Sequence, residues 1–250
     1  MKYAAAFIAG AKALDINLDL DLGGLASAVS GAAAEARVGA EWGGKKYRSG
    51  SIGTKEAFKY GRFSTRMKGW DKPGTVTSLF TYWKGDRWKK WNYAGWSEID
   101  IELAPSAATK DRGSYSTNLI WKNHAMSGQQ LPKHKADPGS GWHTYSFEWT
   151  PDYVVWTFDG KEVRRATTHD PAVTFLRERD QHLIMNFWVP TFHSWHKGFN
   201  PSDMPWYAQY DWVAYDEYDH NSKSFRHKWK DDFNSIDYGR WRVTDHGGFE

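Results

Sequence analysis

Residues 42–218 alternate between short apolar runs and turn residues, and this pattern constrains the fold more than any other feature. No helical periodicity longer than about two turns is visible after Trp42. We therefore expect nine strands, at residues 60–67, 75–83, 97–103, 114–121, 142–149, 154–158, 161–165, 183–188 and 209–218. The Asp159-Gly160 dipeptide tolerates the positive φ angles of a two-residue hairpin turn, so we expect antiparallel pairing. The predicted fold class is all-β, with two antiparallel sheets packed as a curved β-sandwich.

Composition narrows the chemistry. A chain of 250 residues is long enough for one domain with an ample core, and without cysteine it has no disulfide, thiolate metal site or cysteine nucleophile. The net charge of +3 is too small to indicate a polyanionic partner, and no run of eighteen apolar residues predicts a membrane span. The 16 Trp, 13 Tyr and 13 Phe residues suggest partly exposed rings for a flat partner, either sugars or nucleobases.

The first 41 residues differ from the rest of the chain. A basic start followed by a short apolar stretch is typical of a secretory signal, so we interpret residues 1–13 as a candidate signal peptide and the protein as secreted; an ordinary N-terminus is the alternative. Residues 14–22 alternate Leu or Ile with Asp or Asn, which predicts a strand or an acidic pro-segment. Residues 23–41 are rich in Ala, Gly and Ser. We therefore interpret 14–41 as a linker or pro-segment, with a short helix as an alternative for part of it, and 42–250 as the domain.

Three acids alternate with two isoleucines in the most unusual segment of the sequence. On a strand, Glu98, Asp100 and Glu102 share one face. Ile99 and Ile101 share the other face and would anchor the strand in the apolar layer. Crowded carboxylates raise at least one pKa, which leaves a neutral acid beside an ionised partner, as glycoside hydrolysis requires. A solvent-facing acidic strand or a calcium site is the alternative.

The geometry of such a strand is demanding. Retaining glycosidases hold their two carboxyl groups roughly 5 to 5.5 Å apart. On a flat strand, Cα atoms four residues apart are about 13 Å apart. Strand curvature and side-chain convergence must close this difference.

At these residues the chain resembles glycoside hydrolase family 16, and more closely its lichenase branch, whose signature E-I-D-I-E stands at 98–102. Laminarinase-like members insert one more residue before the last Glu, and this chain does not. Other segments similar to the family, in family order, are 60–63, 66–68, 74–76, 147–151, 185–188 and 210–213. The resemblance covers about residues 46–218 and implies a curved β-jelly-roll of the concanavalin A-like kind.

The resemblance also implies roles for individual residues. Glu98 resembles the family nucleophile, Glu102 the general acid and base, and Asp100 the helper between them, which implies a double displacement. Residues similar to those lining the sugar subsites are Arg66, Phe80, Tyr82, Trp96, Asn118, Trp188, Trp195 and Trp241. Each ring has core packing as its alternative. Ser64 stands where lichenases usually carry a cleft Glu, and Lys84 replaces a smaller polar residue. The identity of the glucan substrate therefore stays open.

Two further implications concern chain order and metal. Residues 219–250 resemble the segment that normally begins the domain, which implies a circular permutation. Permuted relatives continue for two or three more strands, so the sequence is truncated, residues 14–22 substitute, or the fold is incomplete. Asp211 resembles a structural calcium ligand of the family; no other cofactor is expected, because the histidines lack a close pairing typical of transition-metal sites.

We expect a secreted, monomeric, retaining endo-β-glucanase acting on mixed-linkage 1,3-1,4-β-glucan or a related β-glucan. A transglycosylase, in which a sugar hydroxyl replaces water, is the second hypothesis. The third is a lectin-like glucan-binding protein without turnover. Binding of single-stranded nucleic acid by the Trp- and Lys-rich residues 83–93 rests on composition alone, and we expect neither a nucleic acid nor a membrane as partner.

Overall fold

Strands make up nearly all of the regular structure in the computed structural model, which describes residues 7–10, 13–18, 50–70, 73–83, 96–104, 115–122, 141–190, 200 and 206–245. The first strands are β1 (Phe7–Gly10), β2 (Ala13–Leu18), β3 (Gly50–Phe58), β4 (Gly61–Lys68), β5 (Val76–Trp83), β6 (Trp96–Leu103) and β7 (Tyr115–Lys122). The others are β8 (His143–Trp149), β9 (Tyr153–Phe158), β10 (Lys161–Thr167), β11 (Gln181–Trp188), β12 (Trp206–Asp219), β13 (Ser224–Asp231) and β14 (Trp241–Asp245), with one short helix, α1 (Pro171–Leu176). Within these described ranges, no helix has the length and apolar composition needed to span a bilayer.

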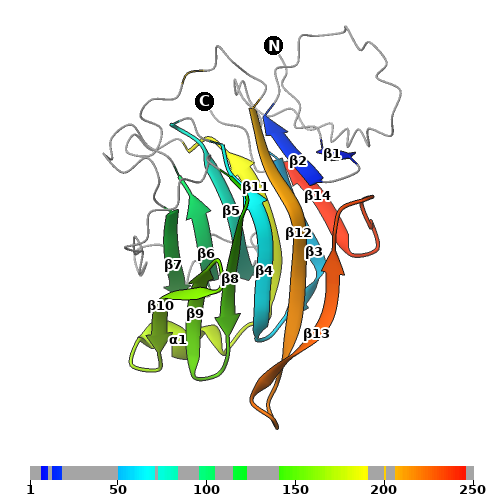
Figure 1. The fold of residues 1–250 in the computed structure, drawn as a ribbon. Helices are drawn as coiled ribbons and strands as arrows, with labels where there is room; N and C mark the ends of the chain where they lie inside the picture. The colour runs from blue at the N-terminus through cyan, green and yellow to red at the C-terminus, as the bar shows by residue number, and fades with distance from the viewer. Residues whose placement is uncertain are drawn as a thin grey trace, which may run out of the picture.

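The strands form two antiparallel sheets that curve together (Figure 1). The eight-stranded sheet has the order β1-β2-β12-β4-β8-β9-β10, and β13 also pairs with β12. The six-stranded sheet has the order β14-β3-β11-β5-β6-β7. The predicted curved, antiparallel, all-β sandwich is therefore confirmed.

Each of the nine predicted strands overlaps an observed one, and the Asp159-Gly160 turn joins β9 to β10 with φ angles of 46° and 76°. Sequence reasoning missed β1, β3, β13 and β14. Strand β3 contains Gly50 and Gly53 and no clean alternation, and β13 is mostly exposed and charged. These strands are specified by pairing with their neighbours more than by their own hydrophobic pattern.

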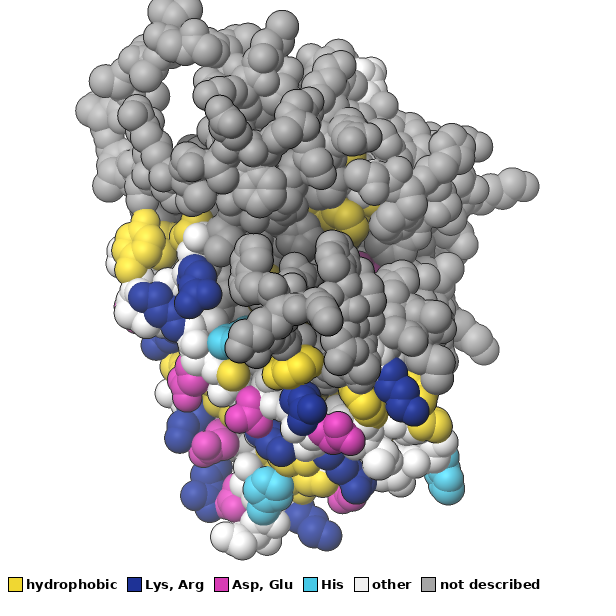
Figure 2. All heavy atoms as spheres, turned by 180° about the vertical axis from the view of Figure 1, so that it is seen from behind, with side chains coloured by type: hydrophobic (Ala, Val, Ile, Leu, Met, Phe, Trp, Pro, Cys, Tyr) yellow, Lys and Arg dark blue, Asp and Glu magenta, His cyan; other side chains and the backbone are white. Residues whose placement is uncertain are grey.

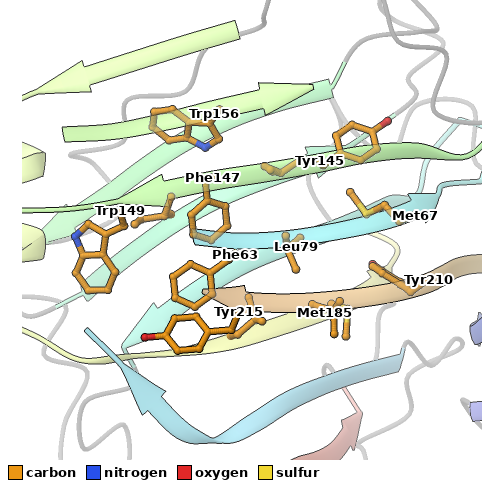
Figure 3. Close-up of a cluster of buried hydrophobic side chains, with 14 of the residues drawn as sticks. Phe63, Met67, Leu79, Tyr145, Phe147, Trp149, Trp156, Met185, Tyr210 and Tyr215 are labelled. Atoms are coloured by element: carbon orange, nitrogen blue, oxygen red, sulfur yellow. The ribbon is translucent and has the colours of Figure 1, made fainter. Parts of the chain in front are cut away.

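The core between the sheets is rich in aromatic rings (Figure 3). The ring centroid of Phe63 lies 5.2 Å from that of Phe147 and 5.1 Å from that of Tyr215. Four tryptophans, Trp149, Trp156, Trp206 and Trp241, are fully buried. Composition suggested many partly exposed rings, but a large share of the rings in the described residues fills the sandwich interior instead.

The chain ends bear on two expectations. Strand β2 pairs antiparallel with β12, so the alternation at residues 14–18 does form a strand, and β1 lies within the candidate signal segment. Residues 23–41 lie outside the described residues. Asp245 at the end of β14 pairs with Gly50 at the start of β3. The permutation itself stays a prediction.

Candidate active site

Strand β6 carries the three acids, and its alternation follows the expected pattern. Ile99 and Ile101 are buried in the core. Glu98 and Glu102 are half-buried on the opposite face, and Asp100 between them is only 2% exposed. The segment is therefore a strand with all three acids on one face, as predicted.

The neighbouring strand β5 contributes aromatic rings to the same face. Tyr82 lies directly opposite Glu98, and Phe80 lies directly opposite Asp100. Because directly paired residues of adjacent strands point the same way, both rings share the acid face and not the core. The Tyr82 ring centroid is 5.9 Å from that of Trp96, in an edge-to-face arrangement. An aromatic row therefore lies beside the acids.

Strand β7 covers the other flank with polar groups. Asn118 lies directly opposite Asp100, and Ser116 lies directly opposite Glu102. The Ser116 hydroxyl donates a hydrogen bond to Glu102 Oε2 at 3.2 Å. Asn118 therefore shares the acid face, and its contact with a sugar stays a prediction.

Small polar side chains extend this face beneath Glu102. They follow one cross-strand row from β3 to β7 and are all buried: Ser51, Asn186, Ser78 and Ser116. The Ser78 hydroxyl donates a hydrogen bond to Asn186 Oδ1. Sequence reasoning missed these residues because cross-strand register is invisible in a single strand's pattern. Together they form a hydrogen-bonding floor on the acid face.

Hydrogen bonds connect the acids to one another and to Trp96. The Trp96 indole donates to Glu98 Oε2 at 2.5 Å. A side-chain hydrogen bond also joins Asp100 to Glu98. Asp100 Oδ1 is buried and has no hydrogen-bond partner among the described residues. A carboxyl group in that position is costly to ionise, because an unpaired buried charge has lost its hydration.

Burial and mutual repulsion raise the pKa values in this group. Burial is the main cause for Asp100, followed by the charges of Glu98 and Glu102, and its pKa lies well above the usual range. Burial and then the charge of Glu98 raise the pKa of Glu102 to about 8, although the hydrogen bond from Ser116 opposes the shift. At neutral pH Glu102 is therefore protonated beside two further carboxyl groups. This arrangement can deliver a proton and a carboxylate to one substrate.

Arg66 does not lie on the acid face. It is on β4 in the eight-stranded sheet, where its neighbour Met67 points into the core and Arg66 therefore points outward. Its Nη1 lies 2.6 Å from Asp211 Oδ2, and its guanidinium lies 5.2 Å from the ring centroid of Trp142. The expectation of a cleft arginine is wrong because β4 belongs to the opposite sheet.

The same ion pair bears on the predicted calcium ligand, Asp211. Its carboxylate is engaged by a guanidinium, and among the described side chains no group of three His, Asp or Glu residues could hold a metal ion. The predicted calcium site at Asp211 would need backbone oxygens for its other ligands, and it stays a prediction.

Trp241 is also placed differently from the expectation. Its side chain is 0% exposed on β14, and its indole donates to Asp231 Oδ2 at 2.7 Å. A ring enclosed in the core has no face for a sugar, so its assignment to a subsite is wrong. Trp188 is half-buried and, by its pairing with Val76, shares the acid face. Trp195 lies outside the described residues.

Comparisons with known proteins find several similar β-glucanases. A β-glucanase of Fibrobacter succinogenes is 32% identical over 225 residues, which are 88% of this chain and 62% of that protein. A β-glucanase of Brevibacillus brevis is 31% identical over 172 residues, 68% of this chain and 61% of that protein. The chain thus spans about three fifths of the length of these curated relatives.

Solved structures and a family model give the same result. A β-1,3-1,4-glucanase (lichenase) derived from a mouse hindgut metagenome has a TM-score of 0.57 at 26% identity, over 81% of this chain and 79% of that one. A native glycosidic hydrolase has a TM-score of 0.57 at 29% identity, over 80% and 76%. The model of glycosyl hydrolases family 16 matches residues 26–214, beginning inside the segment interpreted as a linker or pro-segment. Because this match covers most of the sequence, the chain belongs to glycosyl hydrolases family 16.

Proposed function

We propose that this protein is a retaining endo-β-glucanase that hydrolyses mixed-linkage 1,3-1,4-β-glucan or a related β-glucan. The observation that carries the proposal is the carboxyl trio of β6, with Glu98, Asp100 and Glu102 on one face between aromatic and polar neighbours. The names of the relatives support the substrate class, since several are β-glucanases and one solved neighbour is a lichenase.

In the first step, Glu98 attacks the anomeric carbon of the glucan while Glu102 donates its proton to the glycosidic oxygen. The bond from the anomeric carbon to that oxygen breaks, and the leaving chain departs as an alcohol. The raised pKa of Glu102, about 8, supports its role as the proton donor at neutral pH.

In the second step, Glu102 removes a proton from water, and the resulting hydroxide attacks the glycosyl ester on Glu98. The ester bond breaks, the sugar leaves with its original anomeric configuration, and Glu98 is free again. Asp100 supports this cycle through its hydrogen bond to Glu98, which fixes the orientation of the nucleophile.

The aromatic row supports binding of a polysaccharide. Trp96 and Tyr82 are half-buried beside Glu98 and offer apolar faces for sugar rings. Asn118 and the polar floor offer hydrogen bonds to hydroxyl groups. A polymeric substrate also fits a secreted protein, and secretion is part of the proposal.

The test is the release of reducing ends from barley mixed-linkage glucan, laminarin, xyloglucan and carboxymethylcellulose. We expect release from mixed-linkage glucan and complete loss in Glu98→Gln, which should still bind the polymer. A folded wild-type protein that binds a β-glucan but releases nothing would be a lectin-like protein. Longer products on addition of an acceptor oligosaccharide would identify a transglycosylase.

A further inference from the structure

Arg164 on β10 is a cation in the interior of the sandwich, only 8% exposed. A β-bulge places it there. Strand β10 pairs Glu162 with Thr157 and then Arg164 with Trp156, so Val163 is the extra residue. Without the bulge, Val163 would face Trp156 and Arg164 would point outward. Bulges that re-aim a side chain are frequent beside active sites.

The Arg164 side chain reaches the six-stranded sheet from beneath. Its Nη1 donates to the main-chain oxygen of Thr117 at 2.7 Å and to Thr117 Oγ1 at 3.1 Å. Thr117 is next to Asn118, which lies directly opposite Asp100. The guanidinium is therefore attached to β7 at the level of the carboxyl trio, on the opposite side of the sheet.

A second connection runs through Trp156. The guanidinium carbon lies 4.3 Å from the centre of the Trp156 ring. The indole of Trp156 donates to the main-chain oxygen of Asp100 at 3.0 Å. Arg164 and Trp156 together thus hold both β6 and β7 directly behind Asp100.

Charged side chains of β6 and β10 interact with one another in this region. Asp100 interacts electrostatically with Glu98 and Glu102 on its own strand and with Arg164 behind it. Arg164 in turn interacts with Asp100 and with Asp170, the residue that caps α1. Of the β5 side chains paired with the acids, only the Tyr82 phenol is titratable, and β7 adds the uncharged Ser116 and Asn118.

A buried guanidinium is costly to desolvate, so its persistence there needs a counter-charge. Burial lowers the pKa of Arg164 to about 10, and the carboxylates of Asp170 and Asp100 oppose that shift. The side chain is therefore still protonated at neutral pH.

We propose that Arg164 is a positioning residue that acts as a buried counter-cation for the carboxyl trio. The inference rests on the proposed function, in which the trio performs the chemistry. A positive charge behind Asp100 favours the ionised form of that carboxyl group and, by Coulomb attraction, those of the two glutamates on the same strand. Without it, the trio takes up protons at higher pH, so both limbs of the pH–rate profile shift upward.

The test compares Arg164→Gln and Arg164→Lys with the wild-type protein. Arg165→Gln is the control, because Arg165 is the next residue on β10, is exposed and pairs with Glu162. In Arg164→Gln we expect both limbs of kcat/KM to move up by about one pH unit. Arg164→Lys keeps the charge and should restore the wild-type limbs, and Arg165→Gln should not move them. A lower kcat or Tm in Arg164→Gln with unmoved limbs would reduce Arg164 to a packing residue and overturn the inference.

A second measurement separates this inference from the proposed function. Side-chain carboxyl carbons of Asp and Glu, labelled with ¹³C and titrated by NMR, report protonation without turnover. An upward shift of the trio's titration in Arg164→Gln, relative to Arg164→Lys, supports the inference even if no glucan is cleaved. Identical titrations in an active protein overturn the inference and leave the proposed function intact. If Arg164→Gln does not fold, Arg164→Met provides the same uncharged comparison.

Discussion

The indole of Trp96 donates a hydrogen bond to Glu98 Oε2 over 2.5 Å, from two positions earlier on the same strand. Residues two apart on a strand point to the same face, so the ring and the carboxyl group are held together by the backbone itself. Trp96 therefore has two functions in the proposed site: its N–H orients the nucleophile, and its ring extends the aromatic row beside Tyr82.

Replacing Trp96 with Phe separates these two functions, because the ring stays and the donor is lost. A hydrogen bond to a charged group contributes roughly 1.5–3 kcal/mol, so we expect kcat on mixed-linkage glucan to fall about ten- to a hundredfold. KM should change little. Trp212→Phe, on the eight-stranded sheet, is the matched control and should leave both constants unchanged. A large rise in KM with unchanged kcat would assign Trp96 to sugar binding alone.

Asp100→Asn tests the helper between the two glutamates. The substitution keeps a hydrogen-bond donor for Glu98 but removes a titratable group from the centre of the trio. We expect kcat to fall about ten- to a hundredfold, and binding of the glucan to weaken by less than about threefold. Steady-state kinetics together with calorimetric binding to the inactive double variant with Glu98→Gln give the two numbers. Weaker binding without a slower reaction would contradict the role.

The raised pKa of Glu102 predicts the alkaline limit of activity. The general acid must be protonated, and its pKa is about 8, so kcat/KM should fall as the pH rises through about 8. Ser116 donates to Glu102, and this hydrogen bond lowers the pKa. In Ser116→Ala the alkaline limb should therefore move to higher pH. Profiles measured between pH 4 and pH 10 check both statements. An alkaline limb that does not move in Ser116→Ala would show that Glu102 does not set that limb.

The buried carboxyl group of Glu102 also lowers the free energy of unfolding at alkaline pH. Its pKa rises from 4.5 to about 8 in the folded protein. Between these values the folded state holds a proton that the unfolded state releases, so the free energy of unfolding falls as the pH rises. Glu102→Gln removes this penalty and should raise Tm by several degrees at pH 8 but little at pH 4. Glu217→Gln, an exposed carboxylate on β12, is the control, and an equal gain at both pH values would contradict the explanation.

Trp241→Phe tests the corrected position of that ring. The substitution removes the hydrogen bond to the buried Asp231 carboxylate, so unfolding should cost about 1–3 kcal/mol less. Because the ring is enclosed in the core, kcat/KM on glucan should stay within about twofold of wild type. Denaturant melts and kinetics on the same samples provide both values. Unchanged stability together with a raised KM would instead show that Trp241 binds the substrate.

Nine strands of the domain and the common face of the three acids follow from sequence alone. Side chains alternate between the two faces of any strand, so Glu98, Asp100 and Glu102 had to lie together once 96–103 was extended. Such period-two stereochemistry is local and depends on no other part of the chain. For the same reason the sequence identified nine strands and the Asp159-Gly160 turn.

Only the tertiary structure decided what surrounds that face. Alternation separates two faces of a strand, but which face is buried depends on the sheet to which the strand belongs and on the strands beside it. Arg66 lies on the opposite sheet and Trp241 inside the core, while a bulge turns Arg164 inward behind the acids. The pKa shifts of Asp100 and Glu102 arise mainly from burial, and burial is created by neighbours distant in sequence, which no local pattern contains.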